Sequence, residues 1–347
     1  MSLFNTIRAM PLSVAVTGFL LYLLTRSPPQ YRNPIVQRLR QNLSPSAFSR
    51  LLTTLKWLLG LGVARNINAF LNRFAYNNFR LRSEAANYHW DREVAVVTGA
   101  AGGFGSRIAK DLTRHGLTVI AVDVTPELPA DMQTYPRIHY YRCDLQSRPE
   151  VMALGERVRA EHGAPSVLVN NAGVMFEHSL LDASPRTINI MYGVNVIAHY
   201  WTLQAFLPAM IEAKKGHVVT ISSLACFLAA PGMVPYSNSK AAVMSLHEGL
   251  MQELRVNYSA PQIKCTVVLP TYADTALTAP FADSLRATHQ TVIKPQTVAD
   301  AVVQQILACE SRQILVAPGA GWLPSLRAWP LWLGMGVLRI LDVVLPK

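Results

Sequence analysis

The sequence predicts an α/β fold: a doubly wound parallel sheet, preceded by a helical leader and followed by a hydrophobic C-terminal helix. Strand and helix patterns alternate from residue 93 to residue 318, which is typical of a parallel sheet covered by helices on both faces. Polar residues stand where these strands end, and the carboxyl ends of parallel strands meet at one edge of a sheet. These residues are Thr98, Asp123, Asp144, Asn171 and Ser223.

The first strand pattern, Val94–Val97, leads into a glycine-rich turn. The turn contains Gly99, Gly103 and Gly105, and a helical pattern closed by Gly116 follows it. Such a turn lets backbone N–H groups approach a pyrophosphate at the helix N-terminus, where the helix dipole favours negative charge. Because the glycines lie between a strand and a helix, they predict a Rossmann-type unit that binds a dinucleotide.

The second strand pattern ends at Asp123, 24 residues after Gly99. An acidic side chain there can accept hydrogen bonds from the adenosine ribose and would repel a 2′-phosphate. The turn carries the uncharged Ala100 and Ala101, and Arg142 is the nearby candidate for a phosphate contact. The prediction is therefore NAD as cofactor, with NADP left open. The alternative interpretation is an aspartate that only faces water.

Tyr236 and Lys240 stand four residues apart in the run YSNSK, so a helix places them on one face. A free phenol titrates near pH ~10, and a nearby ammonium is expected to lower that pKa so that the tyrosine can exchange a proton with substrate. Ser223, thirteen positions upstream of Tyr236, can hold the same substrate oxygen. The set suits hydride chemistry at a carbon–oxygen bond. The alternative is an ordinary exposed helical pair.

Together these runs resemble the short-chain dehydrogenases/reductases from about Asp91 to Gly319. Thr98–Gly105 matches their TGxxxGxG loop, and Asn170–Gly173 matches their NNAG motif. The resemblance implies a catalytic tetrad of Ser223, Tyr236, Lys240 and Asn195, with the Asn195 backbone holding a water of the proton relay. The coenzyme contacts that it implies come from Gly99, Gly103, Phe104, Gly105, Asp123, Asp144, Leu145, Asn171, Ala172, Gly173, Tyr236, Lys240, Pro270, Ala273 and Thr275.

One position departs from the family pattern. Thr271 follows Pro270 where the family usually has glycine. If that glycine takes a positive φ, a threonine there is costly, and the loop over the nicotinamide is expected to differ in shape.

The charge is concentrated in the leader. Net charge is +11, and residues 1–83 hold eleven Lys and Arg but no Asp or Glu, whereas the remainder holds 21 basic and 21 acidic residues. A nucleic-acid-binding leader would not carry so many apolar side chains, so no nucleic-acid partner is predicted. A membrane surface is the favoured partner, and a mitochondrial presequence is the alternative.

The leader has two apolar stretches. Seventeen uncharged residues lie between Arg8 and Arg26, at the lower limit for a membrane span, and the basic residues after them place the following domain in the cytosol. Residues 48–79 read as an interfacial amphipathic helix interrupted by Lys56. Four prolines at positions 28, 29, 34 and 45 predict a broken linker between the two stretches.

The expected domains are a leader over residues 1–89, a dehydrogenase domain over 90–319 and a tail over 320–347. The tail carries Trp322, Trp329 and Trp332 beside Arg327 and Arg339, which predicts a helix at the headgroup level of a membrane. A helix that caps the enzyme's own core, or a homodimer interface, is the alternative.

The four cysteines lack CxxC spacing and predict reduced buried thiols. The nine histidines lack metal-ligand spacing, so no metal site is predicted.

The combination of leader, tetrad and tail resembles the membrane-associated retinol and 17β-hydroxysteroid dehydrogenases. This resemblance implies a small lipophilic alcohol or ketone as substrate, and an enzyme on the endoplasmic reticulum membrane or on lipid droplets, with the catalytic domain facing the cytosol. Two alternatives stay open. One is a non-catalytic membrane scaffold on a dehydrogenase fold, and the other is a soluble biosynthetic ketoreductase.

Overall fold

The computed structural model describes residues 13–229, 231–287 and 290–341. The chain divides into two compact units, residues 1–76 and residues 77–347. Residues 77–89, which precede the first strand, belong to the second unit. We call the second unit the catalytic unit, because the predicted site residues lie in it.

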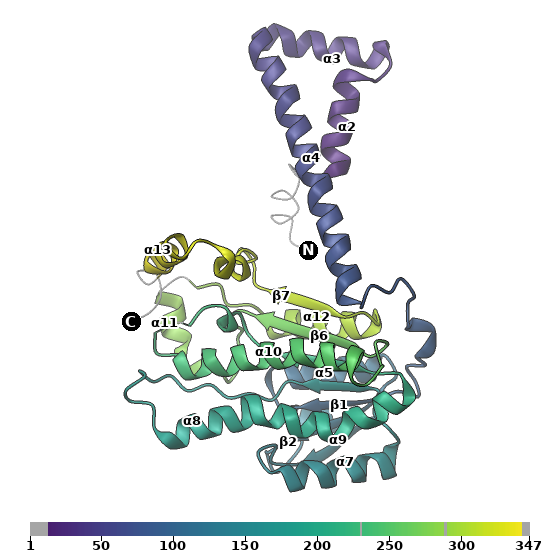
Figure 1. Ribbon diagram of the computed structural model, residues 1–347, viewed down its shortest axis with the longest axis vertical. Coiled ribbons are helices and arrows are strands. Elements are labelled where there is room, and N and C mark those ends of the chain that lie inside the picture. Colours follow the sequence, from purple (N-terminus) through teal and green to yellow (C-terminus); the bar gives the residue numbers. More distant parts are fainter. Residues whose placement is uncertain (1–12, 230, 288–289, 342–347) are drawn as a thin grey trace. The chain divides into compact units, whose positions relative to one another are not determined.

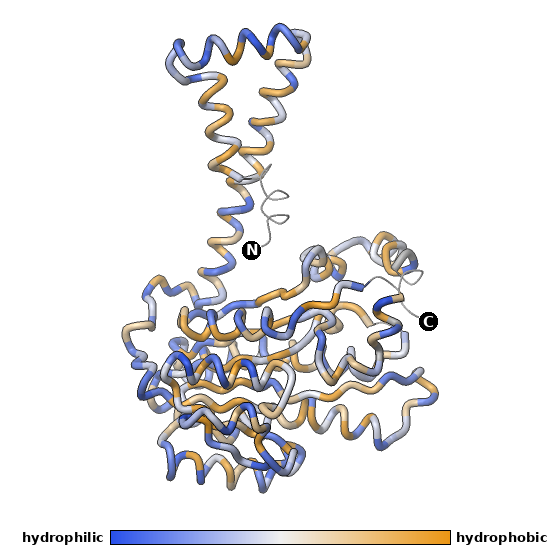
Figure 2. The backbone as a smooth tube through the Cα atoms, turned by 180° about the vertical axis from the view of Figure 1, so that it is seen from behind, coloured by the Kyte–Doolittle hydropathy of each residue, from blue (hydrophilic) through white to orange (hydrophobic). Residues whose placement is uncertain are grey.

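The described part of the first unit is helical. Its helices are α2 (Val14–Thr25), α3 (Pro29–Asn42) and α4 (Pro45–Tyr76). α2 packs against α4, where Thr17, Leu21 and Leu55 are buried. Most residues within α2 and much of α4 are hydrophobic, whereas α3 is mostly hydrophilic (Figure 2). Many large apolar side chains of α2 and α4 remain exposed, among them Phe19, Trp57, Ile67, Phe70 and Leu71.

The predicted broken linker is wrong, because the prolines lie in or beside helices. Pro29 and Pro45 are the first residues of α3 and α4, where a backbone N–H has no helical partner to lose. Pro34 lies inside α3, which continues to Asn42. Proline therefore marks the starts of two helices here and interrupts neither.

The first apolar stretch forms the 12-residue helix α2 and the second forms the 32-residue helix α4. Residues 10–12 of the predicted anchoring segment lie outside the described residues. Within the described ranges, no helix combines the length and the apolar character needed to cross a bilayer.

The second unit contains a seven-stranded parallel sheet in the order β3-β2-β1-β4-β5-β6-β7 (Figure 1). The order reverses between β1 and β4, which makes the sheet doubly wound and confirms the predicted fold class. The strands are β1 (Val94–Thr98), β2 (Thr118–Asp123), β3 (Ile138–Arg142), β4 (Val167–Asn170), β5 (His217–Ile221), β6 (Lys264–Pro270) and β7 (Arg312–Val316).

Helices cover both faces of the sheet because its strands are apolar on both sides. In β1, Ala95 and Val97 belong to the core under α5 (Gly103–Arg114) and α12 (Pro295–Leu307). Val94 and Val96 point to the opposite core, under α7 (Arg148–His162), α9 (Ala198–Ala213) and α10 (Val234–Val256). The shorter elements are η2 (Ala85–Asn87), α6 (Ala130–Gln133), α8 (Pro185–Tyr192), the π-helix η3 (Gly193–Ile197), η4 (Leu224–Cys226), η5 (Ala279–Phe281), α11 (Ala282–Ala287), η6 (Leu323–Ala328) and α13 (Leu331–Leu341).

The four cysteines and two of the histidines, His217 and His247, are core residues. All four cysteines are free and buried, as predicted. His217, at the start of β5, is buried and its Nε2 lies 2.9 Å from Thr266 Oγ1. His247 is buried in α10, and neither ring nitrogen has a hydrogen-bond partner among the described residues.

Candidate active site

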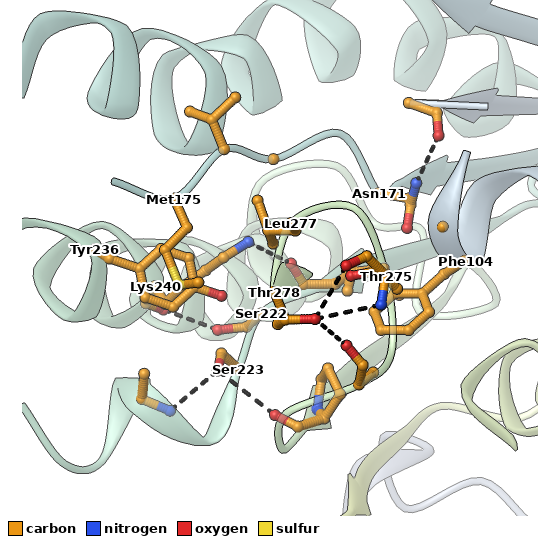
Figure 3. A pocket seen from close by; sticks show the side chains of 18 of the residues that line it. Phe104, Asn171, Met175, Ser222, Ser223, Tyr236, Lys240, Thr275, Leu277 and Thr278 are labelled. Atoms are coloured by element: carbon orange, nitrogen blue, oxygen red, sulfur yellow. Dashed lines mark hydrogen bonds between the residues drawn. The ribbon is translucent and has the colours of Figure 1, made fainter. Parts of the chain in front are cut away.

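The carboxyl ends of the strands border a cavity of about 910 Å³ (Figure 3). The glycine turn and the ends of β2 and β3 form one part of its wall, and α10 with the loops after β4, β5 and β6 forms the other. Of the predicted site residues, those that line the cavity are Gly99, Gly103, Phe104, Asp123, Asp144, Leu145, Asn171, Ala172, Gly173, Ser223, Tyr236, Lys240, Pro270, Ala273 and Thr275. Gly105 and Asn195 lie behind the wall.

The glycine turn requires glycine for two different reasons. Gly99 and Gly103 have φ values of 63° and 53°, which side chains disfavour. Gly105 packs directly on the turn, since an added Cβ would lie 2.1 Å from the Gly99 carbonyl oxygen. Asn171 fixes the turn by donating from Nδ2 to the carbonyl oxygens of Thr98 and Gly99, at 2.9 and 3.1 Å. The turn therefore presents backbone N–H groups at the start of α5 without any side chain in the way.

Asp123 ends β2 at the edge of the cavity. Its Oδ2 accepts a hydrogen bond from the Ala101 N–H at 2.9 Å, and its Oδ1 accepts one from the Val124 N–H at 2.8 Å. The carboxylate is thus held against the glycine turn. Arg142 donates to the Val124 carbonyl oxygen at 3.3 Å, so its guanidinium has a backbone partner beside the same carboxylate.

The end of β3 supplies the neighbouring wall. Asp144 Oδ1 accepts a hydrogen bond from the Gln146 N–H at 3.0 Å, and the Asp144 N–H donates to Glu150 at 3.0 Å. Leu145 lines the cavity beside Asp144. This part of the wall combines an apolar side chain with a carboxylate, which suits an adenine ring.

Tyr236 and Ser223 both line the cavity (Figure 3). Tyr236 lies in the first turns of α10 and is buried. Burial raises the pKa of Tyr236 to about 12, and a hydrogen bond with Ser223 acts in the opposite direction. The Ser223 hydroxyl also accepts a hydrogen bond from the Ala225 N–H at 3.2 Å, which fixes its position at the end of β5.

Lys240 lies one turn after Tyr236, with its Nζ 5.8 Å from the centre of the tyrosine ring. Nζ donates a hydrogen bond to the Ile221 carbonyl oxygen at 3.1 Å, and burial lowers the pKa of Lys240 to about 8. The expected lowering of the Tyr236 pKa by Lys240 is not found. Burial disfavours the charged form of both groups, and sequence spacing alone does not show how deeply a pair is buried.

Asn195 is fully buried in the π-helix η3. Its side chain pairs with the backbone of Val174, since Oδ1 accepts from the N–H at 2.8 Å and Nδ2 donates to the carbonyl oxygen at 2.9 Å. A Cβ on Gly173 would lie 3.4 Å from both Asn195 Oδ1 and Lys240 Nζ. Gly173 therefore lies close to both the asparagine and the lysine. Single π-turns of this kind are frequent at functional sites.

Thr271 does not strain the backbone where the loop after β6 begins. Thr271 is absent from the residues with positive φ in the described chain, and its N–H donates to the Val316 carbonyl oxygen at 3.1 Å. The penalty considered for a threonine there does not arise, because the backbone continues the pairing of β6 with β7. Thr278 closes the loop by accepting a hydrogen bond from the Thr275 N–H at 3.2 Å.

Several residues that line the cavity belong to no motif from which the sequence could have predicted them as site residues. Ser222 donates to the Lys240 carbonyl oxygen at 2.9 Å and joins β5 to α10. Apolar side chains from separate segments also line the cavity. They are Met175, Ile190, Leu224, Leu228, Met233, Tyr272, Leu277, Trp322 and Leu323.

A glycine turn at a helix N-terminus and a Ser–Tyr–Lys set on the same sheet edge define a dinucleotide-dependent oxidoreductase that acts at a carbon–oxygen bond. The chain belongs to the short chain dehydrogenase family, whose model matches residues 93–285.

Known relatives match the chain over somewhat longer stretches. The chain is 35% identical to Dehydrogenase RED2 of Cochliobolus heterostrophus over 202 residues, which cover 58% of this chain and 75% of the relative. It is 29% identical to human estradiol 17-beta-dehydrogenase 11 over 239 residues, which cover 67% of this chain and 78% of the relative. Retinol dehydrogenase 10-A of Danio rerio is a further relative. The chain is thus a member of the group that includes retinol and steroid dehydrogenases.

The fold also matches solved structures. A short chain dehydrogenase/reductase from Burkholderia phymatum in complex with NAD is 26% identical, with a TM-score of 0.64, and the match covers 70% of this chain and 94% of that one. The residues present fit NAD, because the turn is open at Gly102, where a side chain would otherwise stand, and the Asp123 carboxylate lines the same cavity. NAD bound there would supply the hydride acceptor.

Proposed function

We propose that this protein interconverts a lipophilic alcohol and its ketone or aldehyde with NAD(H), at a membrane or lipid-droplet surface. The observation that carries the proposal is the composition of the cavity that Tyr236 lines. Its apolar lining, which includes Met175, Leu277 and Trp322, favours a hydrophobic substrate. The named relatives include a steroid and a retinol dehydrogenase, which agrees with a substrate of this class.

In this proposal Tyr236 exchanges the proton with the substrate oxygen, and Ser223 holds that oxygen through its hydroxyl. Lys240 holds the nicotinamide ribose and supplies positive charge to the site. Asn195 keeps the π-helix in place so that its backbone can hold a water of the relay. The coenzyme is bound by the glycine turn, Asp123, Asp144, Leu145, the NNAG segment and the loop after β6.

The first unit supports the surface localisation. Its helices α2 and α4 expose aromatic and aliphatic side chains, and the chain up to residue 83 carries no carboxylate side chain. Apolar insertion combined with attraction to anionic headgroups, roughly 1 kcal/mol per well-placed cation, gives firm attachment. We place the protein on the endoplasmic reticulum membrane or on lipid droplets, with the second unit in the cytosol.

The non-catalytic scaffold is less well supported. Ser223, Tyr236 and Lys240 all line one cavity, with the hydrogen bonds given above. The soluble ketoreductase has no specific observation in its favour, because the exposed apolar faces of α2 and α4 have no role in it.

The test is a panel of alcohols and ketones assayed with NAD(H) and NADP(H), from short water-soluble alcohols to retinol, estradiol and long-chain secondary alcohols. The expected result is turnover that increases with the apolar size of the substrate. Coenzyme binding without turnover of any panel member would support the scaffold, and preference for polar ketones would support the ketoreductase.

A further inference from the structure

Two apolar segments leave the wall of the cavity on the same side of the catalytic unit (Figures 1 and 2). One is the loop between β4 and α8, which starts at Met175 in the wall and reaches Leu180 and Leu181, 65% and 95% exposed. The other starts in the wall at Trp322 and continues through η6 into α13. There, Leu331 and Trp332 are 79% and 75% exposed. We call the four exposed residues, Leu180, Leu181, Leu331 and Trp332, the rim.

Both segments are fixed to the loop that leads into Tyr236. The His178 N–H, two residues before Leu180, donates to the Gly232 carbonyl oxygen at 3.0 Å. Arg327 of η6 donates from Nη2 to the Cys226 carbonyl oxygen at 2.8 Å. The rim is therefore attached on both sides to the segment that carries the catalytic tyrosine, and its two parts flank one cavity.

The charge around the rim favours one kind of partner. From residue 317 to residue 341 the charged side chains are Arg327 and Arg339, with no carboxylate. Trp322 and Trp329 stack at a ring distance of 6.2 Å beside the exposed Trp332. Glu177 and Asp182 flank the leucine pair, so attraction to anionic headgroups comes from the α13 side. Tryptophans beside arginines and aliphatic side chains suit the boundary between headgroups and acyl chains.

We propose that the rim inserts into a phospholipid surface, so that the cavity opens directly onto the apolar layer. A lipophilic alcohol then moves between lipid and cavity without crossing water. The inference rests on the proposed function but goes beyond it, because it assigns a membrane contact to the catalytic unit itself, separate from the contact made by the first unit. Burying one leucine or tryptophan side chain in lipid increases the partitioning of the protein from water to the lipid surface by about tenfold or more. That is enough to orient the mouth of the cavity toward the lipid.

The first experiment measures the polarity of the surroundings of single rim residues in the full-length protein. All four native cysteines are buried, so a cysteine introduced as Leu181→Cys or Trp332→Cys can be labelled selectively with an environment-sensitive fluorophore. Val256→Cys is the matched control. Val256 is 65% exposed at the end of α10. It lies 20 residues along that helix from Tyr236, roughly 30 Å away.

On phosphatidylcholine–phosphatidylserine vesicles, the labels at 181 and 332 should become brighter and blue-shifted, and brominated lipids should quench them, whereas the label at 256 should not change. Protein that binds the vesicles while all three labels stay unchanged would overturn the proposal. So would labels at 181 and 332 that are shielded without vesicles in proportion to protein concentration, because a second copy would then cover the rim.

The second experiment separates the rim from the chemistry. The double variant Leu181→Asn/Trp332→Ser should lose about tenfold in kcat/KM for estradiol dissolved in vesicles and less than about twofold for water-soluble cyclohexanol. Val256→Asn should change neither. If the wild type turns over no member of the alcohol and ketone panel, the proposed function fails, and the fluorophore experiment still decides whether the rim meets lipid. Equal activities of the double variant and the wild type on vesicle-borne estradiol would overturn the proposal that the rim inserts into lipid, but not the proposed function.

Discussion

The side-chain amide of Asn195 donates a hydrogen bond to Ser239 Oγ at 3.0 Å. Ser239 in turn donates to the Tyr236 carbonyl oxygen at 2.7 Å and directly precedes Lys240. A buried hydroxyl therefore joins the π-helix that carries Asn195 to the helix that carries the tyrosine and the lysine. The sequence YSNSK contains this serine, but its spacing does not show that the hydroxyl faces the neighbouring helix.

Ser239→Ala should lower kcat by about tenfold while the Kd for NAD changes little, because the substitution leaves a buried amide N–H without its acceptor. Ser237→Ala is the matched control in the same helix. The Ser237 hydroxyl is buried with no hydrogen-bond partner in the described chain, so its removal should cost little. Steady-state kinetics, coenzyme titration and thermal melting of both variants check the prediction. Equal kcat values would contradict the role given to Ser239.

The coenzyme preference should follow Asp123. The wild type should use NAD with a higher kcat/KM than NADP, because the carboxylate repels a 2′-phosphate. Asp123→Ser should reduce the difference, mainly through a lower KM for NADP. Comparable kcat/KM values for the two coenzymes in the wild type would contradict the assignment. The same variant also removes the hydrogen bond to the Ala101 N–H, so a moderate loss of NAD affinity is expected as well.

The unfolding free energy should fall as the pH drops below about 6.5. Burial lowers the pKa of His199 and of His217 to about 3 and that of His247 to about 4. A histidine with a lowered folded-state pKa binds a proton first in the unfolded chain, so stability is lost from pH 6.5 downward. Each such group contributes a slope of about 1.4 kcal/mol per pH unit in that window.

His247→Met tests this with one group, because neither ring nitrogen of His247 has a partner to lose among the described residues. Urea unfolding at pH 6 and pH 5 should give a smaller decrease for the variant than for the wild type. An unchanged slope would show that His247 is accessible to protons in the folded state.

Removal of the first unit should release much of the protein from membranes. Deletion of residues 1–76 is the better design, because residues 77–89 belong to the second unit. Asn77 Oδ1 accepts a hydrogen bond from the Ser311 N–H at 3.0 Å, and Arg80 pairs with Glu84 at 3.0 Å. Deletion of residues 1–83 removes both contacts and should lower the melting temperature further.

Fractionation after alkaline carbonate checks the release, and the rim should account for residual binding of the shortened protein. A full-length protein in the soluble fraction, or one processed and imported into mitochondria, would contradict the surface localisation.

The sequence could predict those parts of the site that local spacing determines. Gly99, Ser223, Tyr236 and Lys240 lie within short runs, and each sits at a strand end or on one helix turn, so the sheet topology brings them together. The apolar wall could not be predicted, because Met175, Leu277 and Trp322 are far apart in sequence and meet only in the folded chain.

Two other features escaped prediction for different reasons. The shift of the Tyr236 pKa depends on burial, which four-residue spacing does not reveal. The helix α3 was missed because proline at a helix start and proline in a linker look alike in sequence.

The central claim, that this protein carries out hydride transfer at a carbon–oxygen bond with Tyr236 as the proton-exchanging group, is tested most directly by Tyr236→Phe. NADH formation from the best alcohol of the panel is measured alongside NAD binding. The variant should lose at least about a hundredfold in kcat while it binds NAD as the wild type does, because only the proton-transfer group is removed. A variant that keeps more than a few per cent of the wild-type kcat would contradict the account.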